Sequence, residues 1–383
     1  MDIWFSEKQR ELKALTRKIA LEMVLPKRGY YDDTEDFPWD VVNKLASAGL
    51  FEAIIPEEHG GKGGGITEMC IVTEELSKVC GGIALSFAGT ALGINPILLF
   101  GNQEQKSRYL PGIARGEKLA AFGLTEANAG SDASSIQTQA KTTEEGYILN
   151  GAKQWITNGG EAEVYTIIAI TDKSKGPRGA SAFIVEKGYD GFTFGKKEKK
   201  MGIRASSTRE LIFNNCFVPK ENLLGKEGSG FIIAMKTFDR TRPGVAAQAL
   251  GIARGALDEA LNYTRRRKQF GQSICSFQDI QFKLSDMATQ IEAARALVYS
   301  VAKLIDSGTG KFSKESSMAK VFASDVAVKV TTMALQIFGG YGYLREYPVE
   351  KMMRDAKITQ IYEGTNEIQR GIIALKLIKE TAS

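Results

Sequence analysis

Apolar residues recur at helical spacing in the first and the last parts of the chain. Near the N-terminus, Leu12, Leu15, Ile19 and Met23 follow one another at steps of three or four residues, the spacing of one helix face. A longer series, with alternating steps of four and three, predicts a helix that packs in a bundle. This series consists of Ile280, Leu284, Met287, Ile291, Ala294, Val298, Val301 and Ile305.

The pattern changes in the middle of the chain, from Ala121 to about Leu224. Short runs rich in β-branched and aromatic residues predict extended strands there. The clearest runs are residues 165–170, 181–186 and 210–213. Asn150 and Gly151 separate two apolar runs and predict a tight turn between the strands of a hairpin.

Helices, then strands, then helices again differ from the regular alternation of a doubly wound sheet. We therefore predict a mainly helical α+β fold. A length of 383 residues is enough for two or three domains. The predicted domains are an N-terminal helical domain over residues 1–120, a central β domain over 121–230 and a C-terminal helical bundle over 231–383.

One stretch, residues 79–103, contains no charged residue and is long enough to span a bilayer. It also contains scattered glycines, Asn95 and Pro96, and small polar residues dilute its apolar ones. This composition is more typical of two short buried helices than of a membrane helix. We therefore expect no membrane span.

Charge and cysteine content limit the classes of partner that the protein is expected to bind and the cellular compartment in which it is expected to work. Lys and Arg number 50 against 45 Asp and Glu, and a net charge near +5 is too small for the surface of a nucleic-acid binder. The four cysteines have wide spacings that fit neither a zinc site nor a disulfide framework. The N-terminus lacks the basic and apolar blocks of a secretory signal, so we expect a cytoplasmic protein.

Several common chemistries are disfavoured by the residues present. The only histidine, His59, lies in a Glu-Glu-His-Gly-Gly segment, which argues against Ser-His-Asp, Cys-His and multi-histidine metal sites. The glycine clusters at residues 60–65 and 191–196 match neither dinucleotide-binding nor phosphate-binding loops. Base chemistry then requires a carboxylate, a Lys or a Tyr, and a redox step requires a bound cofactor.

Three segments combine small, hydroxylated and charged residues in a way that suits a cofactor site. Residues 121–132 are small and polar enough for the backbone to approach a planar ring or a phosphate. Trp155 and Thr157 are two positions apart, which predicts that they share one face of a strand. Glu363 stands beside Gly364 in a predicted break between helices.

Together and in this order, the three segments resemble the acyl-CoA dehydrogenase family, of the short- and medium-chain type, over essentially the whole chain. Further segments similar to family motifs are residues 200–204, 238–243, 267–271 and 336–340. The resemblance implies a helical domain, a β-barrel-like domain and a four-helix bundle. It also implies FAD between the β domain and the bundle, and assembly as a homotetramer, a dimer of dimers.

The resemblance implies roles for single residues as well. Those that would line the isoalloxazine or lie near the cofactor are Phe122, Leu124, Thr125, Ser131, Trp155, Thr157, Thr365 and Glu367. Those that would reach the adenosine diphosphate half of a neighbouring subunit's FAD are Arg267, Phe270, Gln336 and Gly340. Those that would meet the substrate are Ser131, Asp239, Arg242 and Gly364.

Glu363 is the catalytic base that the resemblance implies, with its backbone N–H as a donor to the thioester oxygen. Some family branches place the base at the position of Thr241, whose hydroxyl cannot serve, so Glu363 is favoured. Each residue also has a purely structural interpretation. Glu363 would be a surface carboxylate, Trp155 an aromatic ring of the core, and Ser131 a helix cap or turn residue. Asp239 and Arg242 could likewise form an ordinary surface ion pair.

The implied activity is α,β-dehydrogenation of a short, medium or compact branched or cyclic acyl-CoA to the 2-enoyl-CoA. Electrons would pass to an electron-transfer flavoprotein. One alternative is an enoyl-CoA or aryl-enoyl-CoA reductase that works in the reverse direction with the same partner. Another is a non-catalytic member of the family. Chain length would depend on a pocket floor expected near residues 90–98.

Overall fold

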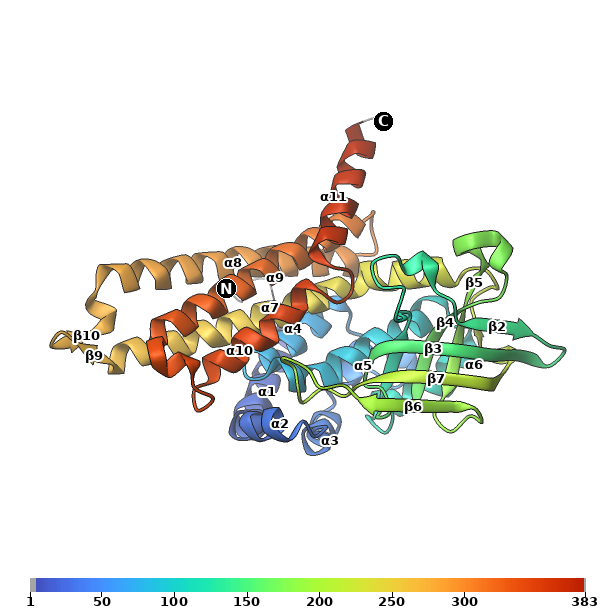
Figure 1. Cartoon of the computed structure of the whole chain (residues 1–383), viewed down its shortest axis with the longest axis horizontal. Helices are drawn as coiled ribbons and strands as arrows, with labels where there is room; N and C mark the ends of the chain where they lie inside the picture. Colours follow the sequence, from blue (N-terminus) through green and yellow to red (C-terminus); the bar gives the residue numbers. More distant parts are fainter. Residues whose placement is uncertain (1–4, 382–383) are drawn as a thin grey trace.

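The computed structural model describes residues 5–381, with a β domain at one end of the molecule and long helices running from it (Figure 1). The helices before the β domain are α1 (Glu7–Ile19), α2 (Arg28–Thr34), α3 (Trp39–Ser47), α4 (Ile66–Ser77), α5 (Gly81–Phe100) and α6 (Gln103–Ala114). Those after it are α7 (Gly230–Arg266), α8 (Gln278–Asp306), α9 (Ser313–Phe338), α10 (Pro348–Lys357) and α11 (Asn366–Thr381).

The β domain is one mixed sheet. Its strands are β1 (Ala120–Gly123), β2 (Gln139–Thr142), β3 (Gly146–Thr157), β4 (Val164–Ile170), β5 (Ala180–Glu186), β6 (Phe192–Lys197), β7 (Thr208–Pro219) and β8 (Leu223–Leu224). They follow the order β6-β7-β3-β2-β4-β5-β8, and β1 pairs in parallel with β4. A separate ribbon of β9 (Lys268–Gln269) and β10 (Gln272–Ser273) lies at the far end of α7. The strands predicted from composition lie in β4, β5 and β7, and the mainly helical α+β class is confirmed.

The hairpin predicted at Asn150 and Gly151 is wrong, because β3 runs straight through both residues. The pairing of β3 with β7 shifts at this point, which marks a β-bulge. A β-carbon on Gly151 would lie 2.8 Å from Thr138 Cα, so only glycine fits the close approach. The Asn150 side chain accepts the backbone N–H of Asn215 at 2.8 Å. An Asn-Gly pair therefore serves a bulge here instead of a turn.

The uncharged stretch forms one long helix, α5, in place of the two short helices predicted. Pro96 lies inside this helix and has no backbone N–H to donate. The neighbouring Asn95 side chain donates from Nδ2 to the carbonyl of Ala91 at 2.7 Å, within the same turns of the helix. β-Carbons on Gly89 and Gly93 would meet the sheet at 2.8 Å and 2.5 Å, so the glycines permit close packing. By length and composition alone, α5 and Ser313–Tyr343 could each cross a bilayer, but most of α5 is buried inside the protein.

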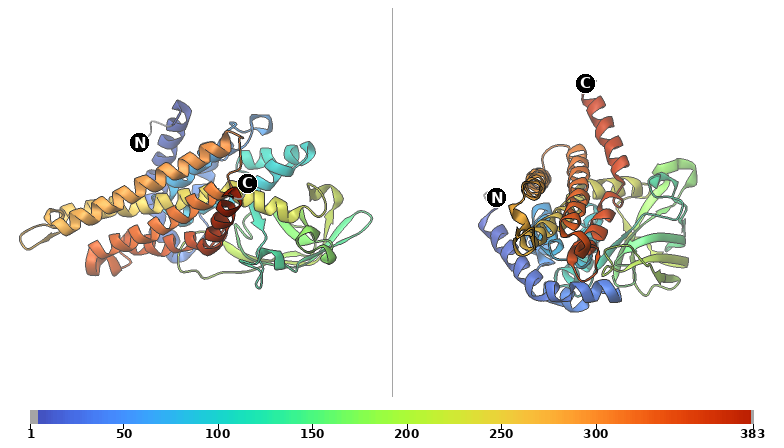
Figure 2. Two further views of the ribbon diagram at one scale, coloured as in Figure 1. Left: turned by 90° about the horizontal axis from the view of Figure 1, so that it is seen from above. Right: turned by 60° about the vertical axis from the view of Figure 1, so that its left-hand side comes forward.

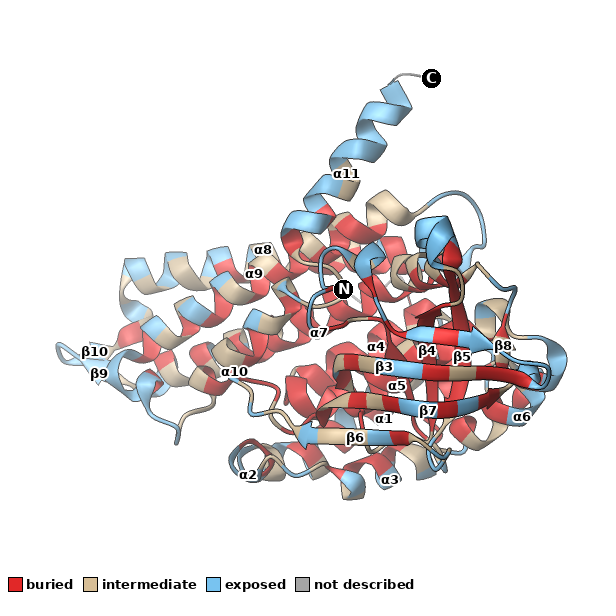
Figure 3. Ribbon diagram, turned by 45° about the vertical axis from the view of Figure 1, so that its right-hand side comes forward, coloured by how far each residue is buried: buried red, intermediate tan, exposed pale blue. Residues whose placement is uncertain are grey.

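The C-terminal helices α7, α8 and α9 pack side by side, and their buried residues face one another (Figure 3). The predicted apolar series lies on α8, where its members from Met287 onward are buried and its first two, Ile280 and Leu284, are partly buried. In contrast, α11 projects from the body of the molecule (Figure 2). The two boundaries between the three predicted domains stay predictions. For function, the important junction is the one where α5 and α7 meet β1 and β3.

Candidate active site

A cleft of about 830 Å³, counting its open mouth, lies between the β domain and helices α5 and α7. From the β domain it is lined by Phe122, Leu124, Thr125, Trp155, Ile156 and Thr157. From the helices and the turn before α11 it is lined by Met69, Leu85, Ala88, Gly89, Leu92, Phe238, Thr241, Gly244, Val245, Gln248, Tyr362 and Glu363. The fold thus brings most of the predicted flavin-side residues and the predicted base into one cavity.

Trp155 reaches the cleft through an irregularity in β3. Its φ is +58°, and the pairing with β7 shifts between Lys153 and Ile156. As a result Trp155, Ile156 and Thr157 all line the cleft, instead of Trp155 and Thr157 alone sharing a face by simple alternation. The indole is 56% exposed, so it is not an ordinary core ring. An exposed aromatic face beside a cavity suits contact with a flat ring system.

A buried ion pair supports the cleft wall from behind. Lys153 Nζ is fully buried, lies 2.6 Å from Glu126 Oε1, and donates to the carbonyl of Leu124 at 3.1 Å. Glu126 also accepts the backbone N–H groups of Gln137 and Thr138 at 2.6 and 2.9 Å. Burial alone would raise the pKa of Glu126, but the charge and hydrogen bond of Lys153 lower it overall. The pair therefore pins the segment that carries Leu124 and Thr125.

Sequence reasoning missed Lys153 and Glu126 as a pair. The available signals were a Lys within a predicted strand and a Glu inside a run of small residues. Neither signal predicts that the two residues form a buried pair, because most charged residues in a sequence are exposed to solvent.

The base candidate sits in a left-handed turn between α10 and α11, which confirms the predicted break between helices. Glu363 has φ +51° and Gly364 has φ +89°. Gln369 Nε2 donates to both of their carbonyls, at 3.0 and 3.1 Å. Lys320 Nζ, fully buried, donates to the Gly364 carbonyl at 2.9 Å and to Asn366 Oδ1 at 2.8 Å. Backbone strain at Glu363 is thus held by buried donors from α9 and α11.

The Glu363 carboxylate faces the cleft, so it is not a plain surface group. Burial raises the pKa of Glu363, and a hydrogen bond from Thr241 together with the charges of Arg242 and Lys320 opposes part of that rise. Thr241 Oγ1 donates to Glu363 Oε2 at 2.8 Å. Arg242 is buried beside this turn and pairs with Asp239 Oδ1 at 2.7 Å, so this pair is not an ordinary surface one.

Other predicted site residues lie outside the cleft. Ser131 is exposed in the loop between β1 and β2, Thr365 is half-buried, and Glu367 is exposed in the first turn of α11. Arg267 and Gly340 instead line a second cavity at the β9–β10 end of the bundle, where the Arg267 guanidinium lies 5.3 Å from the centre of the Tyr341 ring. Gln336 and Phe270 are exposed near this end, Phe270 by 93%.

Known family models match this chain along almost its whole length. The acyl-CoA dehydrogenase models for the N-terminal, middle and C-terminal domains match residues 6–117, 121–216 and 228–378. The chain belongs to the acyl-CoA dehydrogenase family. This acyl-CoA dehydrogenase is therefore an oxidoreductase of the class that acts on CH–CH bonds, as the motifs predicted.

Curated relatives include enzymes named for both directions of such a reaction. A short-chain specific acyl-CoA dehydrogenase of Clostridium acetobutylicum is 49% identical to this acyl-CoA dehydrogenase, over 99% of this chain and 100% of its own. The acryloyl-CoA reductase (NADH) of Anaerotignum propionicum is 48% identical, over 99% of this chain and 96% of its own.

Solved structures share the fold of this acyl-CoA dehydrogenase. The butyryl-CoA dehydrogenase of Megasphaera elsdenii has a TM-score of 0.96 at 48% identity and covers 99% of this chain and 100% of its own. A chain solved in work on the electron transferring flavoprotein of Acidaminococcus fermentans has a TM-score of 0.96 at 51% identity, over 98% and 99%. An acyl-CoA dehydrogenase complexed with FAD, from Bacillus anthracis, has a TM-score of 0.92 at 38% identity, over 99% and 69%.

Proposed function

We propose that this enzyme oxidises a short acyl-CoA to the 2-enoyl-CoA, with Glu363 as the base and FAD bound in the cleft beside Trp155. The observation that carries the proposal is the place of the Glu363 carboxylate. It shares one cavity with Trp155 and Thr157, and its pKa is raised toward the range in which a carboxylate is an effective base.

The residues of the cleft suit FAD. Phe122 and the exposed Trp155 offer aromatic surface, and Thr125 and Thr157 offer hydroxyl groups on the same wall. The structure of an FAD complex in the same family supports this choice. When bound, FAD supplies the acceptor for the hydride that leaves the β carbon of the substrate. Ser131, Thr365 and Glu367 remain proposed contacts at the edge of this site.

The chain's own part in the chemistry is to remove the α proton and to stabilise the charge that develops. An α proton of a thioester is weakly acidic, so donors must be aimed at the carbonyl oxygen beforehand. We assign one donor to the backbone N–H of Glu363, in the turn that Gln369 and Lys320 hold. Arg242, buried behind Glu363, and Asp239 are proposed to orient the turn and the substrate.

Replacing Thr241 with Val is expected to shift the pH dependence of kcat/KM. Glu363 acts only when deprotonated, so activity rises with pH through its pKa. Loss of the Thr241 hydrogen bond, which now lowers this pKa, should move the acidic limb up by about 1 pH unit. Thr241→Ser keeps the hydroxyl and should keep the limb in place. An unmoved limb in Thr241→Val would contradict the assignment of Glu363 as the titrating base.

The second cavity supports a site shared between two chains. Thr241 lies in the first half of α7 and Arg267 directly follows its last residue, so the two are about 39 Å apart at 1.5 Å per residue. A single dinucleotide does not span that distance, so Arg267, Phe270, Gln336 and Gly340 would serve the FAD of a neighbouring subunit. The exposed apolar residues Leu375, Leu377 and Ile378 on the projecting α11 also suit a homotetramer (Figure 1).

Arg267→Ala is expected to lower the amount of FAD that stays bound per chain after gel filtration, because the second half of the cofactor loses a cation. Flavin absorbance relative to protein measures this. Arg115, exposed and paired with Glu117, provides the matched control, and Arg115→Ala should keep a full complement. Equal FAD retention in both variants would remove Arg267 from the cofactor site.

The proposal also covers the electron acceptor and the direction in which the reaction runs. An electron-transfer flavoprotein is the proposed partner, supported by the similar chain solved in work on such a flavoprotein. The similarity to an acryloyl-CoA reductase favours one second candidate, reduction of an enoyl-CoA. Assays of butyryl-CoA with an artificial acceptor, and of crotonyl-CoA with a reduced donor, separate the two. We keep two secondary proposals: a substrate with an aryl-enoyl or compact cyclic acyl group, and a cytoplasmic location. Purified protein that is colourless and unable to take up FAD would instead support a non-catalytic member of the family.

A further inference from the structure

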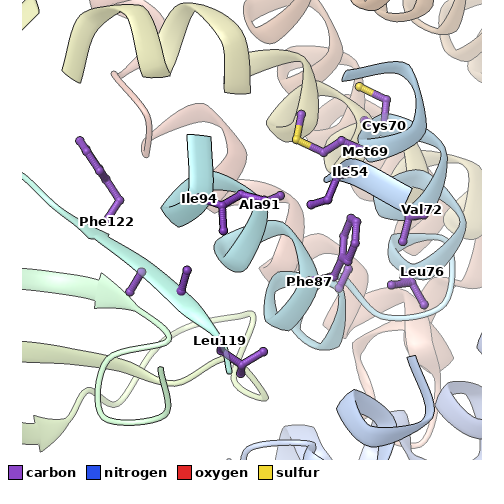
Figure 4. Packing of buried hydrophobic residues seen from close by; sticks show 14 of the residues in the cluster. Ile54, Met69, Cys70, Val72, Leu76, Phe87, Ala91, Ile94, Leu119 and Phe122 are labelled. Atoms are coloured by element: carbon purple, nitrogen blue, oxygen red, sulfur yellow. The ribbon is translucent and has the colours of Figure 1, made fainter. Parts of the chain in front are cut away.

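The turn that carries Glu363 is held by polar groups, whereas the helices beside the cleft are held together by apolar ones. Helices α4 and α5 pack through buried side chains such as Leu76 and Phe87 (Figure 4). The turn instead meets Lys320 of α9, whose fully buried ammonium group donates to the Gly364 carbonyl at 2.9 Å. Burying an ammonium group is costly unless hydrogen bonds and negative charge compensate for the loss of water.

The charge of Lys320 is compensated mainly by Glu363. Burial lowers the pKa of Lys320 to about 8, and the negative charge of Glu363 opposes this effect most strongly, followed by Asp325 and Glu367. Arg242 adds to the lowering, because it is a second cation near the same turn. A lysine with this pKa still carries its proton at neutral pH. The ammonium group and the Glu363 carboxylate therefore act on each other as unlike charges.

Lys320 also belongs to a hydrogen-bond network that fixes the start of α11. Asn366, the first residue of α11, accepts from Lys320 at 2.8 Å. The Asn366 amide donates to Ser324 Oγ at 2.9 Å and to Asp325 Oδ1 at 2.8 Å. Asp325 also accepts from Arg370, one turn further along α11, at 2.6 Å. Three residues of α9 thus hold the first turn of α11, and the turn with the base directly precedes this helix.

We propose that Lys320 is a positioning residue for the base: it fixes the turn of Glu363 through the Gly364 carbonyl, and its positive charge favours the deprotonated carboxylate. This inference rests on the proposed function, since it takes Glu363 as the base. Lys320 itself does not touch the substrate in this proposal. It acts through the backbone of the turn and through its charge.

The surroundings of the Glu363 carboxylate allow the charge of Lys320 to be tested separately. Burial raises the pKa of Glu363, and three groups oppose that rise: the Thr241 hydroxyl, the Arg242 guanidinium and the Lys320 ammonium. The neighbouring Tyr362 stays neutral, because burial and the charge of Glu363 raise the pKa of its phenol. Removing the charge of Lys320 should therefore raise the pKa of Glu363 while the other two opposing groups stay in place.

Neutral and charged replacements of Lys320 test the proposal. Lys320→Gln removes the charge, and the Gly364 carbonyl keeps its hydrogen bond from Gln369 Nε2 at 3.1 Å. The acidic limb of kcat/KM for butyryl-CoA should move up by about 1 pH unit, or about tenfold in activity at a pH below the limb. Lys320→Met, similar in length but apolar, is a second neutral variant and should move the limb in the same direction. Lys320→Arg keeps the charge and should keep the limb in place.

Lys329 provides the matched control, because it is an exposed lysine on the same helix, α9. Lys329→Gln should leave the limb in place. An unmoved limb in both neutral variants, while Thr241→Val moves it, would overturn the role of Lys320 alone. A limb that moves as far in Lys320→Arg as in Lys320→Gln would overturn it too, since the charge would not be the cause. If neither Lys320→Gln nor Thr241→Val moved the limb, the proposed base itself would be wrong.

Hydrogen exchange of the backbone gives a second readout that needs no turnover. Lys320→Met removes a donor from the turn, so amides of residues 361–370 should exchange at least about threefold faster than in the wild type. Mass spectrometry of peptides from the FAD-loaded enzyme measures this rate. Lys329→Gln should exchange at the wild-type rate in this segment. Unchanged exchange in Lys320→Met would show that Lys320 does not fix the turn.

Discussion

Replacing Glu363 with Gln is expected to lower kcat for butyryl-CoA by about 10²–10⁴-fold, the usual loss when a general base is removed. The amide keeps the shape of the side chain and can still meet the Thr241 hydroxyl, now 2.8 Å from Glu363 Oε2, but it cannot take a proton. FAD content should stay close to that of the wild type. The affinity for S-butyl-CoA, a thioether that binds but cannot react, should also stay close to the wild-type value. Steady-state assays with an artificial electron acceptor, together with calorimetry, measure these quantities.

Glu104 provides the matched control for this variant, because it is an exposed glutamate in the first turn of α6, outside the cleft. Glu104→Gln should keep a normal kcat. A near-normal kcat in Glu363→Gln would show that another group removes the α proton.

Replacing Lys153 with Met is expected to lower the free energy of unfolding by about 3–5 kcal/mol, because it leaves the buried Glu126 carboxylate without its cation. The carbonyl of Leu124 loses a hydrogen bond as well, so the cleft wall that carries Leu124 and Thr125 should loosen. The flavin-to-protein ratio should therefore fall with the stability. Denaturant unfolding, followed by tryptophan fluorescence, gives the first quantity, and absorbance gives the second.

A double variant separates loss of the ion pair from loss of packing. Lys153→Met with Glu126→Gln leaves no unpaired charge and should recover part of the stability. Lys175→Met removes an exposed lysine that pairs with Asp172 and should change stability by less than about 1 kcal/mol. If Lys153→Met cost no more than Lys175→Met, the buried pair would have no structural role.

Periodic segments were predicted well because their signals are local. The series along α8 and the runs in β4 and β5 come from residues a few positions apart, and burial of one face follows from that spacing. The Asn-Gly pair at 150–151 misled the prediction for the same reason. A turn and a bulge need the same local conformational freedom, and only the pairing with β7 selects between them.

The candidate site was predicted in its components but not in its geometry. The motifs named Glu363, Trp155 and Thr157, yet the backbone irregularity at Trp155 is what turns three consecutive residues toward the cleft. Met69 looks like any apolar residue of an N-terminal helix. It lines the cleft beside Gly244, which is far along the chain on another helix.

Composition and pattern were enough to argue against histidine-based chemistry and to indicate the helix-strand-helix order, and the family resemblance was enough to propose a carboxylate beside a glycine as the base. They could not indicate what surrounds that carboxylate. Thr241 is 122 residues away from Glu363, and Lys320 acts on the turn from a separate helix. The raised pKa of Glu363 is the balance of burial against these distant donors and charges, and that balance exists only once the bundle has packed.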